Sequence, residues 1–213
     1  GEHWGNIIHY RNDGDRNAAS WTRASTDGYY SYFPLDLAGN SAPALADLDG
    51  DGDLDMFIGQ VHGNLLYFRN DGDLAGAKWT ALGVQISLPL VNHPHAYPTL
   101  VDIDADGDFD LFIGRGTWDP SDHGGNLYFY RNDGSPQLPS WTLVDDNYAA
   151  INVGGYSVPA FVDIDHDGDF DLFVGREDGR LSFYRNDGTP SSPSWVLVSS
   201  NYSGINLDGY SAP

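Results

Sequence analysis

The stretch that decides the fold lies at residues 158–175, which read VPAFVDIDHDGDFDLFVG. It consists of a short apolar run, an aspartate-rich loop and a second apolar run that ends in Gly175. Two earlier stretches, residues 42–59 and 97–114, contain the same three parts in the same order. Self-similarity at a regular spacing indicates a repeat architecture, in which each copy forms one structural unit.

A proline marks each copy of the repeat, and these prolines recur every 54 to 61 residues, at Pro43, Pro98, Pro159 and Pro213. This period is typical of propeller blades and exceeds that of leucine-rich or ankyrin repeats. A second block, which ends in Asn-Asp-Gly, occurs four times. The tryptophans that follow these blocks are Trp21, Trp79, Trp141 and Trp195. Asn-Asp-Gly tolerates a positive φ, so each block predicts a tight turn between two strands.

Each period contains four short strand-like runs, which glycine, asparagine, aspartate and proline separate, and none shows helical periodicity. In the third copy we expect strands at residues 160–164, 172–174, 181–185 and 195–198. Four antiparallel strands form one blade. The sequence therefore predicts an all-β fold, a β-propeller with four-stranded antiparallel blades.

We expect residues 1–213 to form a single β-propeller repeat domain. Its expected parts are an outer half-blade at 1–40, complete blades at 41–95, 96–156 and 157–210, and the start of another blade at 211–213. A half-blade with free edges is costly, because unpaired strand edges expose hydrogen-bonding groups. We therefore expect these three complete blades and the half blade to belong to a larger propeller or to one assembled from several copies.

The composition narrows the class of partner. The chain has 10 lysines and arginines against 31 aspartates and glutamates, a formal net charge of -21, and it contains no cysteine. Such a charge repels nucleic acids and anionic lipid, and no apolar run is long enough for membrane insertion. Disulfides and thiolate chemistry are excluded. A cysteine-free, acidic, glycine-rich chain fits a secreted or cell-surface protein, in which calcium replaces disulfides.

Three loops fit the pattern D-x-D-x-D-G-x-x-D, at residues 47–55, 102–110 and 163–171. Carboxylates at positions 1, 3 and 5 can converge on a cation, and the glycine at position 6 permits a sharp turn. Position 7 offers its backbone carbonyl, and the aspartate at position 9 closes the shell. The expected metal residues are Asp47, Asp49, Asp51, Asp53, Asp55, Asp102, Asp104, Asp106, Asp108, Asp110, Asp163, Asp165, Asp167, Asp169 and Asp171.

The donor set of these loops indicates the metal. Multiple carboxylate oxygens select Ca²⁺ over zinc or copper, and Mg²⁺ prefers to keep its waters. The alternative is that the loops are solvated hairpin turns, but carboxylates packed this closely repel one another without a cation. The sequence therefore predicts three calcium sites, one per complete blade, with a structural role because the protein fills most coordination positions.

At these loops the chain resembles the FG-GAP/VCBS repeat family of β-propellers, which includes integrin α-subunit heads and many bacterial surface proteins. The match is carried by Ala42 and Pro43, by the three aspartate loops and by the phrase GTPSSPSW at residues 188–195. The resemblance implies calcium between the first two strands of each blade, held by positions 1, 3, 5 and 9 and by the carbonyl of position 7. It also implies a role in adhesion or ligand binding.

Residues that depart from the repeat are the better candidates for ligand binding, because blade packing does not require them. An insertion at residues 115–125 contains Trp118, Asp119, Asp122 and His123, which can stack on a sugar and bond its hydroxyls. A longer surface hairpin is the alternative. For the recurring tryptophans we favour packing between blades over a sugar-stacking ladder. The arginine before each Asn-Asp-Gly is expected to pair with local acids or carbonyls.

Three functional hypotheses follow. The first is an extracellular adhesion or carbohydrate-binding module with glycans or another surface protein as partner. The second is a structural or filament-forming surface protein that assembles with other copies of itself by strand complementation. The third is the propeller part of a polysaccharide lyase. Catalytic signatures such as G-x-S-x-G, H-E-x-x-H and a phosphate loop do not occur in the sequence, so we expect no catalytic residues.

Overall fold

The protein is described by a computed structural model of the chain. The described residues are 7–8, 10–15, 17–23, 39–72, 76–88, 95–117, 124–135, 138–207 and 209–213. Within them the chain forms three four-stranded antiparallel sheets and one two-stranded sheet. The only helices in these residues are two short 3-10 turns, η1 (Tyr148–Ala150) and η2 (Tyr202–Gly204). No helix of the described residues is long and apolar enough to cross a membrane.

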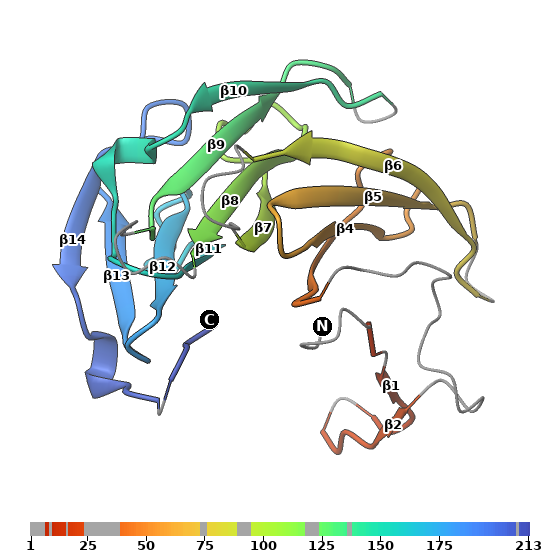
Figure 1. Cartoon of the computed structure of the whole chain (residues 1–213), viewed down its shortest axis with the longest axis horizontal. Coiled ribbons are helices and arrows are strands. Elements are labelled where there is room, and N and C mark those ends of the chain that lie inside the picture. The colour runs from red at the N-terminus through yellow and green to blue at the C-terminus, as the bar shows by residue number, and fades with distance from the viewer. Residues whose placement is uncertain are drawn as a thin grey trace.

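The three large sheets follow one plan, in which consecutive strands are hydrogen-bonded neighbours. The first sheet contains β3 (Ala42–Ala46), β4 (Asp55–Gly59), β5 (Asn64–Asn70) and β6 (Trp79–Ser87). The second contains β7 (His95–Val101), β8 (Asp110–Gly116), β9 (Leu127–Asn132) and β10 (Trp141–Asp145). The third contains β11 (Ser157–Val162), β12 (Asp171–Arg176), β13 (Leu181–Asn186) and β14 (Trp195–Ser199). The sheets lie side by side along an arc, as propeller blades do, which confirms the predicted fold class (Figure 1).

The two-stranded sheet pairs β1 (Tyr10–Asn12) with β2 (Trp21–Arg23). Both strands are exposed along their whole length. The pair carries the Asn-Asp-Gly block and the tryptophan that mark the third and fourth strands of the larger sheets. It therefore has the sequence character of the outer half of a blade.

The first strand of the third sheet differs from the prediction. We expected a strand at residues 160–164, but β11 runs from Ser157 to Val162. Pro159 lies inside it, opposite Val174 of β12. A proline is tolerated there because β11 is the edge strand of its sheet, so the missing N–H breaks no ladder bond. The strand ends earlier than expected because Asp163 already belongs to the aspartate loop.

The core lies between sheets and is centred on their second strands. Every residue of β4, and the first five residues of β8 and of β12, are buried. One cluster joins Phe57 and Leu65 of the first sheet to Leu111 and Ile113 of the second. Another joins Leu127 of the second sheet to Leu172 and Val174 of the third. Each blade therefore stabilises its neighbours, as expected of stacked repeats.

A repeated contact explains why each second strand carries a glycine at its fifth residue and each first strand carries a proline. Gly59 lies against β7, and a Cβ at this position would lie 2.8 Å from Cδ of Pro98. Gly114 lies against β11, and a Cβ there would lie 2.7 Å from Cδ of Pro159. The absent side chain lets the first strand of the next blade pack directly on the second strand of the previous one.

Two of the four repeated tryptophans pack between blades, as predicted. Trp141 of β10 contacts Phe57 of the preceding blade edge-on, with ring centroids 5.6 Å apart. Trp195 of β14 donates a hydrogen bond from its indole nitrogen to the Tyr148 hydroxyl at 3.1 Å. Trp21, on the two-stranded sheet, is 65% exposed. Packing between blades therefore accounts for the tryptophans of the second and third sheets, whereas it does not account for the exposed Trp21.

Candidate metal centre

The three aspartate loops occupy equivalent places in the three sheets. Each loop joins the first strand of its sheet to the second, that is, β3 to β4, β7 to β8 and β11 to β12. The flanking strands are paired to their last residues, with Ala46 opposite Asp55, Val101 opposite Asp110 and Val162 opposite Asp171. The ladder thus fixes both ends of every loop.

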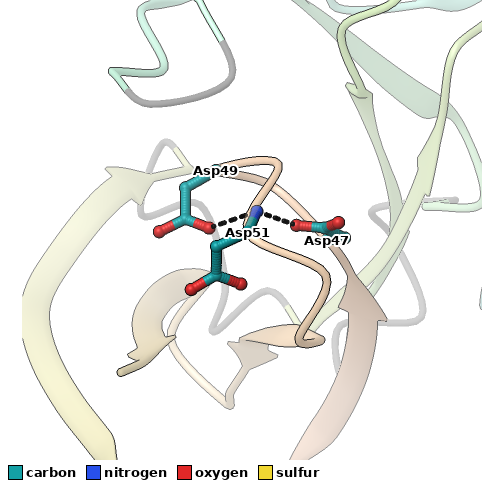
Figure 2. Close-up of side chains that lie close together, drawn as sticks. All are labelled: Asp47, Asp49 and Asp51. Atoms are coloured by element: carbon teal, nitrogen blue, oxygen red, sulfur yellow. Dashed lines mark hydrogen bonds between the residues drawn. The ribbon is translucent and has the colours of Figure 1, made fainter. Parts of the chain in front are cut away.

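The first aspartate of each loop organises the loop backbone. Asp47 Oδ1 accepts the backbone N–H groups of Gly50 at 2.8 Å and Asp51 at 3.1 Å, and its Oδ2 accepts that of Gly52 at 3.0 Å. Figure 2 shows the bonds that Asp51 donates to the carboxylates of Asp47 and Asp49. These bonds curl the chain so that the next two acidic side chains turn towards the first.

The glycine at position 6 has the backbone conformation that the pattern requires. Gly52, Gly107 and Gly168 have φ values of 95°, 98° and 96°. Residues with side chains rarely adopt such values. Position 4 is also left-handed, and there Ala105 and His166 have φ values of 61° and 65°. Gly50, with a φ of 74° at position 4 of the first loop, was the sequence signal of this second constraint, which alanine in the second loop does not reveal.

The structure brings positions 1, 3 and 5 of each loop together. One carboxylate oxygen from each of the three aspartates lies within 4.8 Å of the other two. The triads are Asp47, Asp49 and Asp51, then Asp102, Asp104 and Asp106, then Asp163, Asp165 and Asp167. The aspartates at positions 7 and 9 are outside these groups. For position 7 this suits the expectation that only its backbone carbonyl serves as a ligand.

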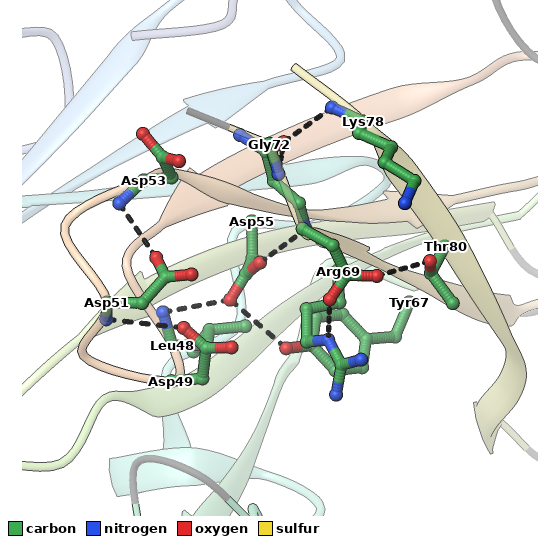
Figure 3. A network of polar contacts seen from close by, with 12 residues as sticks. Leu48, Asp49, Asp51, Asp53, Asp55, Tyr67, Arg69, Gly72, Lys78 and Thr80 are labelled. Atoms are coloured by element: carbon green, nitrogen blue, oxygen red, sulfur yellow. Dashed lines mark hydrogen bonds and ion pairs between the residues drawn. The ribbon is translucent and has the colours of Figure 1, made fainter. Parts of the chain in front are cut away.

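The ninth aspartate has a clear structural role in the first loop. Asp55 is fully buried, and its carboxylate accepts the N–H groups of Leu48 at 3.1 Å and Asn70 at 2.8 Å and the Tyr67 hydroxyl at 3.1 Å (Figure 3). Asp110 and Asp171 likewise accept the N–H groups of Asn132 and Asn186, both at 2.9 Å. Position 9 therefore ties each loop to the third strand of its sheet.

The carboxylates of each loop lie close together, and several of their pKa values are raised. Burial, followed by the charge of neighbouring aspartates, raises the pKa of Asp49, Asp108, Asp165 and Asp169. Burial raises the pKa of Asp110 to about 7. Each ionised loop is thus electrostatically unfavourable by itself, and a bound cation would remove the repulsion.

The loops fit a hard cation on two grounds. Every side-chain donor of the triads is a carboxylate oxygen, the ligand that calcium prefers. In addition, Asp104 Oδ1 at position 3 and Asp110 Oδ2 at position 9 are buried and have no hydrogen-bond partner in the described part of the chain. A buried carboxylate oxygen without a donor is costly, and coordination to a metal ion satisfies it.

The predicted carbohydrate site at Trp118, Asp119, Asp122 and His123 lies outside the described residues. Sequence reasoning missed a different feature, a cavity of about 490 Å³ where the first strands β3, β7 and β11 converge. Its lining includes Tyr97, Tyr156 and Tyr210 and holds no charged side chain. The Tyr156 ring lies 6.1 Å from that of Tyr97 and 4.7 Å from that of Tyr210. The three tyrosines therefore form a continuous aromatic wall.

A signal for this wall was present in the repeat itself. The residue before the marker proline is Ala42, Val158 or Ala212 in the other copies, and Tyr97 replaces these small residues in the second copy. Burial, together with the nearby Tyr156 and Tyr210 hydroxyls, raises the pKa of Tyr97. Blade packing does not require a tyrosine at this position.

Comparison with known proteins agrees with this geometry. Residues 47–113 and 102–174 each match the family described as FG-GAP-like repeat, and together the two matches cover more than half of the chain. Each match spans one aspartate loop, the rest of its blade and the loop of the next. No curated protein matches the chain. The chain therefore belongs to the FG-GAP-like repeat family, whose repeats form modules often involved in adhesion or ligand recognition.

Proposed function

We propose that this protein is an extracellular calcium-binding repeat module for adhesion or carbohydrate recognition, with calcium in a structural role. One observation carries the proposal: three triads of aspartate carboxylates lie in equivalent loops of three sheets. FG-GAP repeats are commonly calcium-binding and typical of extracellular or surface proteins, which supports both parts of it.

Calcium in these loops would stabilise the blades. When bound, the ion supplies positive charge between carboxylates that otherwise repel, and it joins residues on both sides of the turn. In this role the side chains of positions 1, 3, 5 and 9 hold the ion together with the backbone carbonyl of position 7, and position 9 also anchors the loop to the third strand. Few coordination positions then remain for a substrate, so we propose a binding protein without catalytic activity at the metal.

The cavity between the first strands is the surface that best suits a saccharide. Tyrosine rings offer flat apolar faces on which a sugar ring can stack, and hydroxyl groups match those of the sugar. Its lining contains the hydroxyls of Tyr97, Tyr156, Tyr210 and Thr99 and is uncharged, in a chain whose net charge is -21. An uncharged aromatic cavity favours a neutral sugar over an acidic one.

Self-assembly is the second candidate function. Within the described residues, the sheet of β1 and β2 has two strands where the others have four. Its aromatic side chains Tyr10 and Trp21 are 52% and 65% exposed. Strands from another copy would pair with β1 and cover these rings, which would join copies into a polymer. The two candidates differ in readout, because assembly depends on protein concentration and needs no sugar.

A glycan array probed in millimolar calcium and again in excess EDTA tests the recognition proposal. We expect the protein to bind a neutral glycan, and we expect EDTA to weaken this binding. The variant Tyr97→Val, which introduces the residue that the third copy has at this position (Val158), should not bind the glycan. The matched control is Tyr10→Val, which changes an exposed tyrosine far from the cavity in sequence and should bind normally. Absence of binding by the wild type in both conditions would contradict carbohydrate recognition, and polymers seen by light scattering would then favour self-assembly.

A further inference from the structure

The three aspartate loops differ in one side chain that reaches them from the third strand. In each sheet an aromatic residue of the second strand stacks on one of the third. The stacked pairs are Phe57 with Tyr67 at 5.1 Å, Phe112 with Phe129 at 4.6 Å and Phe173 with Phe183 at 4.7 Å between ring centroids. These pairs are also directly opposite in the strand register. Of these three stacked pairs, only the first carries a hydroxyl on its third-strand ring, that of Tyr67.

In the first loop this hydroxyl donates a hydrogen bond to the aspartate at position 9, Asp55. Tyr67 donates to Asp55 Oδ2 at 3.1 Å, and the same oxygen accepts the N–H of Leu48. The other oxygen accepts the N–H of Asn70. Both oxygens of the Asp55 carboxylate thus have donors from the protein (Figure 3).

In the second loop the corresponding oxygen, Asp110 Oδ2, has no donor among the residues that the structure describes. Phe129 has no hydroxyl, and Asp110 accepts one hydrogen bond, from the N–H of Asn132 to its Oδ1. Asp110 is 2% exposed, and its Oδ2 has no hydrogen-bond partner among the described residues. Asp104 Oδ1, in the triad of the same loop, is also buried without one. This loop therefore holds two buried carboxylate oxygens that protein donors leave unsatisfied.

The third loop is intermediate. Phe183 again lacks a hydroxyl, but Asp171 Oδ2 accepts the N–H of Ile164 at 3.3 Å, a longer bond than its counterpart in the first loop. Asp169 Oδ1 is also buried without a partner in the described residues, but Asp169 is at position 7, where the backbone carbonyl is the expected ligand. The intermediate place of this loop therefore rests on the bonds of Asp171.

We infer that the three loops bind calcium with unequal affinity, the second most tightly and the first most weakly, and that the Tyr67 hydroxyl weakens the first. A cation gains most where it satisfies buried carboxylate oxygens that lack donors. In the first loop it competes with donors that already hold Asp55 in place. The inference rests on the proposed calcium binding and adds an order to it.

Calorimetric titration of calcium into metal-free protein tests the order, with exchanged aromatic residues as the matched pair. Tyr67→Phe removes the hydroxyl and keeps the ring, and we expect the weakest step to tighten by about tenfold, the size of a hydrogen bond to a charged group. Phe129→Tyr supplies the hydroxyl to the second loop, and we expect the tightest step to weaken by a similar factor. Phe183→Tyr should weaken the intermediate step.

Single loop variants assign the steps to the loops. Asp104→Asn should abolish the tightest step, and Asp49→Asn should abolish the weakest. If Asp104→Asn fails to fold, Phe129→Tyr still decides the question, because it alters no loop residue. Three indistinguishable steps, or an unchanged titration of Tyr67→Phe, would overturn the inference and leave the proposed function standing. Absence of any calcium uptake by the wild type would overturn both.

Discussion

Each four-stranded sheet has two acidic turns, the aspartate loop and the Asn-Asp-Gly hairpin, and the two differ in how their negative charge is compensated. The aspartate of each Asn-Asp-Gly block pairs with the arginine two residues earlier, as in the pairs of Arg69 with Asp71 and Arg185 with Asp187 at 2.6 and 2.5 Å. This confirms the predicted role of the repeated arginines. In the aspartate loops the acidic groups lie mainly against one another.

The pKa values of the two turns move in opposite directions for this reason. The hydrogen bond from Arg185 lowers the pKa of Asp187. In the loop of the same sheet, burial and then the Asp167 charge raise the pKa of Asp169. The same residue type is thus stabilised as an anion in one turn and destabilised in the other. Of these two kinds of turn, only the aspartate loops therefore need a bound cation to compensate their charge.

Removal of calcium should have the largest effect, and it should act through the loops alone. With free calcium about tenfold above Kd, three sites contribute roughly 4 kcal/mol, because each contributes about 1.4 kcal/mol. EDTA should then lower Tm by about 8–16 °C in a chain of this size, as followed by circular dichroism. The matched control is the triple variant D47N/D102N/D163N, whose Tm should not respond to EDTA. A similar response in both proteins would contradict the assignment.

The second-largest loss of stability should come from removing the asparagine side chain that caps an Asn-Asp-Gly hairpin. This loss should be the same with and without calcium. Asn186 Oδ1 accepts the N–H groups of Gly188 at 3.0 Å and Ser194 at 2.8 Å, and the residue is 1% exposed. Asn186→Ala leaves both donors without an acceptor, so we expect a loss of about 2 kcal/mol, or about 4–8 °C in Tm.

The control for this prediction is Asn12→Ala in the hairpin of β1 and β2. Asn12 makes the same two bonds, to Gly14 at 3.0 Å and Ser20 at 2.9 Å, but it is exposed. Water can replace its amide, so the loss should be smaller. An equal loss in both variants, or a loss that depends on calcium, would break the distinction between hairpins and loops.

The metal-free protein should gain stability on mild acidification. Burial raises the pKa of Asp110 to about 7, so its favourable contribution is complete below its unfolded pKa of about 4 and is lost as pH rises through 7. Asp187 has a lowered pKa, so its contribution is lost when the pH falls below about 4. We therefore expect Tm to rise by about 2–4 °C between pH 8 and pH 5 and to fall below pH 4.

Calcium should reverse the first part of that profile, because protons then compete with the ion for the loops. Scans from pH 8 to pH 3 with calcium and with EDTA measure the difference. Asp110→Asn removes the titrating carboxyl and should flatten the rise in EDTA. A metal-free Tm that falls steadily from pH 8 would contradict the assigned direction.

The exposed arginine–aspartate pairs should have the smallest effect. Arg185 and Asp187 lie at the surface, where solvent screens their attraction. We expect Arg185→Gln to change Tm by less than about 2 °C and the change to shrink further in 1 M salt. A change as large as that of Asn186→Ala would mean that charge pairing, and not the asparagine cap, holds the hairpin.

The fold followed from the sequence because its signals are local and repeated. Short apolar runs between turn residues predicted the four strands of a blade, and the spacing of Pro43, Pro98 and Pro159 predicted the length of the repeat. The contact of Gly59 with β7 could not be predicted, because it depends on how closely two blades approach. Proline inside β11 was likewise missed, since only the sheet shows that this strand lies at an edge.

For the metal site, the sequence predicted which side chains meet but not how the ninth aspartate is used. The spacing of Asp47, Asp49 and Asp51 is a property of one short loop, so it could be deduced. The bonds of Asp55 to Asn70 and Tyr67 connect residues 15 and 12 positions apart, across two strands. The aromatic wall was missed for the same reason, because Tyr97, Tyr156 and Tyr210 are more than 50 positions apart in the chain.

Equilibrium dialysis of metal-free protein against calcium, with the bound metal counted by atomic emission, tests the central claim most directly. We expect three calcium ions per wild-type chain and none on the D47N/D102N/D163N variant. A wild-type chain that binds no calcium at millimolar concentration, or a variant that binds as much as the wild type, would contradict the assignment of calcium to the aspartate loops.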